Sequence, residues 1–142
     1  MTDRQRLVDQ VIRHEGIRLT VYLDSLGVPT IGIGRNIRDK GITSAEALAL
    51  LDHDLDECIA DLSGAFPWFL DLDAVRQRVL VDLRFQLGPV GIRGFRKMLA
   101  ACGRGDFTAA SHELLASHLA EQTPNRAIEL AGMLHSGEEI ET

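Results

Sequence analysis

The chain has 142 residues, of which 45% are apolar and 25% are charged, with 15 lysines and arginines against 21 acidic residues. These proportions are typical of a globular protein of one domain, or of two lobes that share a core, and they exclude disordered and fibrous classes. The first residues carry charges throughout, and no stretch approaches the ~20 apolar residues that span a bilayer. We therefore expect no cleavable signal, no stable membrane insertion and synthesis in the cytosol. The net charge of −6 argues against nucleic acid as a partner, because phosphate binding needs a basic surface.

The two cysteines and five histidines are the residues best suited to binding a metal. Their positions show no metal-ligand spacing, and two cysteines are too few for a disulfide framework. We expect no metal and no cofactor. Cys58 and Cys102 are predicted to be small buried hydrophobic side chains.

The first forty residues combine one helix with segments of strand spacing. Thr2 and Gln5 have the spacing of a capping box, which predicts a helix ending near His14 with Gly16 as its stop. Alternation of polar and apolar residues then predicts a hairpin. Its strands are expected at 19–24 and 30–34 with a turn at 25–27, followed by a short third strand or loop at 35–41.

The rest of the chain is predicted to be helical. Thr43 and Glu46 form a second capping box, opening a helix that ends near Leu62. An apolar stripe along this helix is expected to be buried, at Leu48, Leu51, Leu55, Ile59 and Leu62. Four more helices are expected: from 71 or 73 to 87, ended by Gly88-Pro89 and central in the core, then at 92–101 and 107–119, and from Pro124 to just before Gly137.

These elements predict a single α+β domain over residues 1–142, mostly helical and divided into two lobes. The small lobe holds the hairpin and spans about residues 15–60. The large lobe spans about residues 61–142 and includes the first helix, 1–14, packed back on it. The cleft between the lobes is the expected place for a ligand.

Glu15 is the first candidate for chemistry. It follows Val11 and Ile12 by one helical turn and so continues the apolar face of the predicted helix. It also ends that helix, where the negative end of the helix dipole disfavours a carboxylate. Both effects favour the protonated form that a general acid needs near neutral pH. The pattern leaves open an exposed terminal glutamate with no catalytic role.

Asp24 and Thr30 are the second pair of candidates. Asp24 ends the first strand on its polar face, and Thr30 shares a face of the returning strand with Gly32 and Gly34. If these faces coincide, both side chains stand beside a floor of glycines that gives a bulky ligand access to the backbone. One carboxylate in an apolar setting and one in a polar setting suit hydrolysis of a glycosidic bond. A turn aspartate and a strand threonine without a role remain the alternative.

Motifs along nearly the whole chain resemble those of the T-even-type phage lysozymes, glycoside hydrolase family 24. The amino-terminal ones are His14-Glu15-Gly16-Ile17-Arg18-Leu19, Tyr22-Leu23-Asp24 and Gly27-Val28-Pro29-Thr30-Ile31-Gly32-Ile33-Gly34. Those further on are Leu72-Asp73-Ala74-Val75-Arg76, Phe85-Gln86-Leu87-Gly88 and Gln122-Thr123-Pro124-Asn125-Arg126-Ala127. They occur in the family's order.

The resemblance implies a two-lobed lysozyme-like fold and an inverting muramidase. Glu15 would be the general acid, Asp24 would orient or activate the water, and Thr30 would help to hold it. The bond cut would be the β-1,4 link from N-acetylmuramic acid to N-acetylglucosamine in peptidoglycan, with the two carboxyl groups roughly 6.5–9.5 Å apart. Phe85 and Gln86 would line the cleft. Arg126 would lie near Glu15 as a charged partner, the alternative being a surface arginine paired with Glu129 or another acid.

Three departures from the family pattern concern charge and packing. Arg35 stands where the family often has histidine, so an ion pair from that position would not titrate near neutral pH. His118-Leu119-Ala120 stands where many members have an aromatic residue. The net charge of −6 is unusual among phage lysozymes, since opposite charge would assist the encounter with an anionic wall.

The sequence as a whole predicts a bacteriolytic endolysin of phage origin, monomeric, made in the host cytoplasm and acting on the cell wall in the periplasm. Lacking a signal or anchor of its own, it would depend on a separate holin or on attachment to a larger particle. Two alternatives stay open. One is a peptidoglycan-binding lysozyme-fold module of a phage particle with weak or no catalysis, and the other is a hydrolase directed at chitin.

Overall fold

The computed structural model describes residues 1–140, and Glu141 and Thr142 lie outside the described part. The chain divides into two compact units, Met1–Leu50 and Leu51–Thr142. The predicted class is confirmed, because helices dominate and the strands form one small antiparallel sheet. The sequence prediction drew the lobe boundary near residue 60 and added residues 1–14 to the large lobe, and that assignment stays a prediction.

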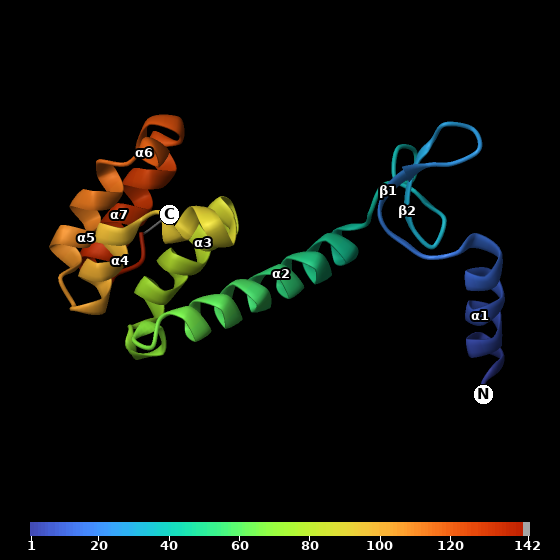
Figure 1. Ribbon diagram of the computed structural model, residues 1–142, viewed down its shortest axis with the longest axis horizontal. Helices are drawn as coiled ribbons and strands as arrows, with labels where there is room; N and C mark the ends of the chain where they lie inside the picture. The colour runs from blue at the N-terminus through green and yellow to red at the C-terminus, as the bar shows by residue number, and fades with distance from the viewer. Residues whose placement is uncertain (141–142) are drawn as a thin grey trace. The chain divides into compact units, whose positions relative to one another are not determined.

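The Met1–Leu50 unit holds one helix and a three-stranded sheet. Helix α1 (Asp3–Glu15) is followed by β1 (Arg18–Leu23), β2 (Pro29–Gly32) and β3 (Arg35–Asn36), and Figure 1 shows β1 and β2 forming the hairpin. The sheet is antiparallel in the order β1-β2-β3, with Thr30 facing Tyr22 on one side and Asn36 on the other. Thr30 therefore lies on the central strand of the sheet.

The capping box predicted for α1 is confirmed. The Gln5 amide donates to Thr2 Oγ1 at 3.1 Å, and the Thr2 amide donates to Gln5 Oε1 at 2.8 Å. The apolar side of the helix has little cover in this unit, because Leu7, Val8 and Val11 are all at least 40% exposed. Helix α1 starts as the sequence predicts, and none of its residues is buried.

Helix α2 (Ser44–Ala65) begins with the second predicted capping box. The Thr43 amide donates to Glu46 Oε1 and the Glu46 amide donates to Thr43 Oγ1. Within each unit, the predicted buried stripe is found only towards the end of the helix: Leu62 is fully buried, Leu55 is half-buried, and Leu48, Leu51 and Ile59 are exposed. In the Leu51–Thr142 unit the last turns of α2 enter the core through Cys58 and Leu62.

The remaining helices pack together in the Leu51–Thr142 unit, with α4, α5, α6 and α7 side by side and α3 next to them (Figure 1). They are the 3₁₀ turn η1 (Phe69–Asp71), α3 (Ala74–Arg93), α4 (Arg96–Gly103), α5 (Phe107–Leu115), α6 (His118–Gln122) and α7 (Pro124–Ser136). Helix α3 supplies Val79, Leu80, Leu83 and Ile92 to the buried core and α4 supplies as many residues, so a central place for α3 stays a prediction. Cys58 and Cys102 are free and buried, as predicted. Across residues 1–140 no helix is both long and apolar enough to cross a membrane.

Two predicted helices need correction, and one predicted break is confirmed. The helix expected at 92–101 is α4, Arg96–Gly103, because the residues up to Arg93 belong to α3 and the backbone at Phe95 is not helical. The segment 107–119 is two helices, because Ser117 adopts an extended backbone and its hydroxyl donates to the Leu114 carbonyl at 2.6 Å. The predicted stop at Gly88-Pro89 is confirmed, because the backbone leaves the helical conformation there and the range given for α3 joins two helices. Gly88 has φ 76° and ψ 176°, and one further helical segment then runs to Arg93. Gly137 ends α7 in the left-handed conformation, as the sequence indicates.

Candidate active site

Glu15 is the last residue of α1, and its carboxylate lies against Gly34, between β2 and β3. A methyl group placed on Gly34 would come within 2.8 Å of Glu15 Oε2 and 3.1 Å of its Cδ. Gly34 also has φ +66°, a conformation that favours glycine. Glycine at position 34 therefore allows this positive φ and leaves room for the Glu15 carboxylate where it lies.

The apolar setting predicted for Glu15 is not found among the residues of its own unit, where the side chain is exposed. Of the two apolar residues one turn before it, Val11 is exposed and Ile12 is half-buried. What the structure does supply is a fixed neighbour, Gly34, which places the carboxylate beside the sheet that carries Thr30.

Asp24 and Thr30 are both anchored to the same residue, Val28. Asp24 Oδ1 accepts hydrogen bonds from the Leu26 amide at 2.8 Å and the Val28 amide at 2.9 Å, which closes the turn between β1 and β2. Thr30 Oγ1 donates to the Val28 carbonyl at 2.8 Å. These bonds hold the two side chains on one short segment of backbone.

This anchoring leaves particular oxygens available for chemistry. Both hydrogen bonds to Asp24 end on Oδ1, so within the part of the chain described here Oδ2 accepts none. The Thr30 hydroxyl uses its hydrogen on Val28 and retains its lone pairs as acceptors. Thr30 itself is a buried side chain, on the central strand of the sheet.

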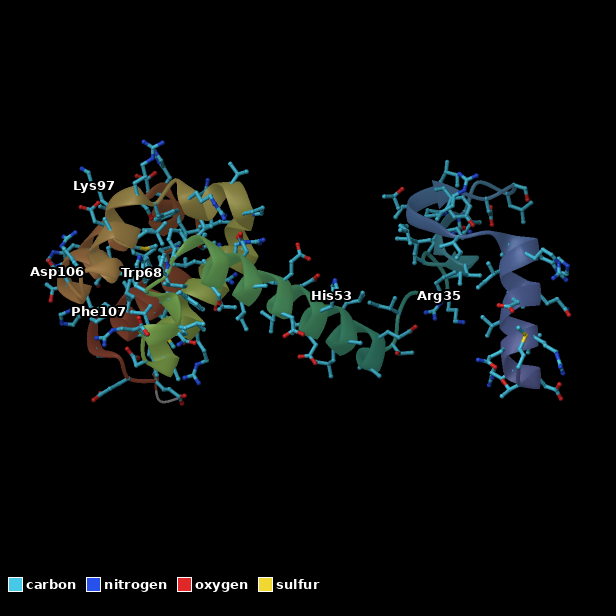
Figure 2. The ribbon with its side chains drawn as sticks, turned by 60° about the horizontal axis from the view of Figure 1, so that its bottom comes forward. Arg35, His53, Trp68, Lys97, Asp106 and Phe107 are labelled. Carbon is cyan, nitrogen blue, oxygen red and sulfur yellow. The ribbon has the colours of Figure 1, made fainter. Side chains whose placement is uncertain are left out.

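Sequence reasoning missed how Arg35 is used. Its guanidinium donates twice to Glu46, at 3.0 and 2.6 Å, and once to the Gly41 carbonyl at 3.1 Å, and Figure 2 shows Arg35 beside the start of α2. The hydrogen bonds from Arg35, reinforced by the Thr43 amide, lower the pKa of Glu46 to about 2. Arg35 thus ties β3 to the first turn of α2. The sequence drew attention to Arg35, but it did not indicate that Glu46, eleven residues further on, is its partner.

Phe85 and Arg126 lie together in the Leu51–Thr142 unit. Both line a largely apolar groove of about 550 Å³, whose other walls include Leu55, Ile59 and Val81. The Arg126 guanidinium donates to Asp82 through Nε at 3.0 Å and also through one terminal nitrogen. Its partner within this unit is therefore an acid of α3, and not the Glu129 considered in the sequence analysis. Phe85 is 45% exposed, which leaves an aromatic surface open to a ligand.

Gln86 faces a different neighbour. Its Nε2 lies 3.5 Å from Thr123 Oγ1, at the N-terminus of α7. Its Oε1 is buried and is the one buried side-chain oxygen or nitrogen in residues 1–140 without a hydrogen-bond partner. An unpaired buried oxygen is costly, and this one has no exposed surface, so a ligand could reach it only after the Gln86 side chain turns outward.

Comparison with known proteins now adds to this geometry. Residues 12–133 match the phage lysozyme family. The chain is 32% identical to the pre-baseplate central spike protein Gp5 of Enterobacteria phage T4, over 96% of its own length and 30% of that protein. It is 24% and 26% identical to two probable T4-type lysozymes of Dictyostelium discoideum, covering over 90% of each chain. The chain thus spans about a third of the spike protein but nearly all of the other two.

The family match extends over most of the chain and includes Glu15, Asp24 and Thr30. The chain belongs to the phage lysozyme family. That membership makes it a glycoside hydrolase of the lysozyme type, and it confirms the resemblance to T-even-type lysozymes drawn from the motifs.

Proposed function

We propose that the chain is a muramidase that hydrolyses the β-1,4 bond between N-acetylmuramic acid and N-acetylglucosamine in peptidoglycan, with inversion at the anomeric carbon. Family membership supports the class of reaction. The observation that carries the mechanism is the common anchoring of Asp24 and Thr30 on Val28, which leaves one carboxylate oxygen and one hydroxyl oxygen free to accept from water.

In the proposed reaction Glu15 protonates the glycosidic oxygen as the bond to the anomeric carbon breaks. A water molecule held by Asp24 Oδ2 and Thr30 Oγ1 attacks that carbon from the opposite face, and its proton passes to Asp24. Room for this water is what distinguishes an inverting site from a retaining one. The β-linked substrate then yields a product whose new reducing end is first formed as the α-anomer.

Phe85, Gln86 and Arg126 are proposed to bind the glycan. The exposed face of Phe85 suits contact with the apolar C–H surface of a sugar ring. Gln86 would bind a hydroxyl or acetamido N–H through Oε1 once its side chain turns outward, since this oxygen is buried and unpaired in the structure. Arg126 can bind a sugar carbonyl or carboxylate, because Asp82 engages only part of its guanidinium.

Two cellular roles are candidates for this chain. An endolysin, acting as a monomer and reaching the periplasmic wall through a separate holin, is the role we propose first. The second candidate is a lysozyme module of a phage particle, which is favoured by the 32% identity to a spike protein. Retained lytic activity of the isolated chain is compatible with both roles, whereas peptidoglycan binding without cleavage would favour a non-catalytic module.

The proposal is tested by loss of turbidity of Gram-negative cells with a permeabilised outer membrane. Wild type should clear them, and Glu15→Gln should not, because the amide keeps the shape but has no proton to transfer. Glu129→Gln, which makes the same change at an exposed position of α7, should clear at the wild-type rate. Clearing by Glu15→Gln at the wild-type rate would refute Glu15 as the acid. Equal clearing of chitin and peptidoglycan would refute the proposed substrate.

A further inference from the structure

A second groove, of about 290 Å³, lies in the Leu51–Thr142 unit and is not lined by any residue assigned to catalysis or glycan binding above. Its walls come from the segment after α2, from the end of α3 and from α4. Figure 2 shows Trp68 among the helices of this unit. The lining residues are Phe66, Trp68, Arg93, Arg96, Leu99 and Ala100.

Trp68 is held in a fixed position at one end of this groove. A methyl group placed on Gly103 would come within 2.8 Å of the indole Nε1, so the ring packs directly on the last residue of α4. The Phe66 ring lies 5.2 Å away, centroid to centroid, at a tilt of 33°. Because Arg96, Ala100 and Gly103 are spaced by four and three residues, they share one face of α4, and the groove follows that face.

Every polar side chain that lines the groove is a hydrogen-bond donor. Arg93 is already engaged by Asp61, at 2.7 and 3.0 Å, and by the Pro89 carbonyl. In residues 1–140 neither the Arg96 guanidinium nor the indole N–H of Trp68 has a side-chain or backbone acceptor, and both are available.

Of the two arginines that line the groove, Arg93 is neutralised by Asp61, and Arg96 has no acidic partner in residues 1–140. No acidic residue occurs between positions 85 and 105, although the net charge of the chain is −6. A ligand with acceptors, a negative charge and an apolar face would complement Arg96, the indole N–H and the aromatic rings. An N-acetylated sugar with a carboxylate offers all three: C–H surface for the indole, a carbonyl for the indole N–H and a carboxylate for Arg96.

We propose that this groove binds a muramyl unit of peptidoglycan, through its acetamido group and the carboxylates of its lactyl or peptide substituents, at a place separate from the cleaved bond. The inference rests on the proposed function, since it takes the same polymer as ligand. A second contact would hold the enzyme on the wall between cleavage events.

Trp68 is the single tryptophan of the chain, so its fluorescence reports on the groove directly. The probe is N-acetylmuramyl dipeptide, which has no glycosidic bond between sugars and cannot be cleaved by a muramidase. We expect a saturable change in Trp68 emission, and about a 10-fold weaker Kd in Arg96→Ala, because a charge-assisted hydrogen bond is lost. Lys97→Ala removes the neighbouring exposed cation, which does not line this groove, and should leave the Kd unchanged.

Because the probe reads binding alone, failure of the groove and failure of the muramidase proposal are distinguishable. An emission change that is the same in Arg96→Ala as in wild type would overturn the inference. So would binding of neutral chitotetraose as tight as that of the muramyl probe, or a response to phosphatidylglycerol vesicles and none to the probe. In each of these cases the wild type would still clear cells, so the muramidase proposal would be unaffected.

Discussion

Substitution of Gly34 by alanine tests whether the position of the Glu15 carboxylate matters. The new methyl group would lie 2.8 Å from Glu15 Oε2, which falls about 0.6 Å short of the 3.4 Å at which ordinary contacts begin. The carboxylate ends a flexible side chain, so it should move aside and leave the fold intact. Because misplacement of a catalytic group by about 1 Å can cost roughly 100-fold in rate, we expect kcat to fall about 10- to 100-fold.

The matched control is Gly41→Ala in the same unit. Gly41 has φ +62° against +66° for Gly34, so both alanines carry a similar backbone strain of about 1–2 kcal/mol. A methyl group on Gly41 meets nothing closer than the Ile37 carbonyl at 3.9 Å. Initial rates on solubilised peptidoglycan, at matched helical content by circular dichroism, should separate the two variants. Equal rates for both would refute the view that Gly34 makes room for the catalytic carboxylate.

Two further predictions concern ion pairs and pH. Hydrogen bonds from Arg93 and Arg84 lower the pKa of Asp61 to about 2. The ionised Asp61 therefore contributes about 2 kcal/mol to the free energy of unfolding above pH 4, and this contribution is lost as the pH falls towards 2. Asp61→Asn should thus have a lower free energy of unfolding in urea than wild type at pH 7, and the difference between the two proteins should shrink near pH 2. A difference that does not change with pH would count against the pairing. Arg35→His should lower Tm more at pH 8 than at pH 5, because histidine loses its charge as the pH rises while Glu46 keeps its own. Thermal melts at the two pH values check this, and equal losses would contradict it.

Local signals in the sequence predicted much of the fold. Thr2 and Thr43 sit three residues before glutamine and glutamate, and both capping boxes form. The break between α5 and α6 could not be predicted in this way, because it depends on Ser117 turning its hydroxyl back to the Leu114 carbonyl. Which apolar residues of α2 are exposed could not be predicted either, since apolar periodicity indicates which residues share a face but not what covers that face.

The candidate site shows the same division between local and distant information. The motifs identified Asp24 and Thr30, and the short hairpin makes their common neighbour, Val28, almost inevitable. The contact of Glu15 with Gly34 spans nineteen positions and depends on how α1 meets the sheet. The Trp68 groove gave no signal in the sequence, because it forms only when α4 packs beside the segment after α2.

The central claim is that Glu15 drives cleavage of the bond on the muramic acid side. Digested peptidoglycan should be reduced with borohydride, and its new ends identified by mass spectrometry. The account predicts muramitol from wild type and from Glu129→Gln, and no new ends from folded Glu15→Gln. Glucosaminitol as the product, or muramitol released by Glu15→Gln at the wild-type rate, would contradict it.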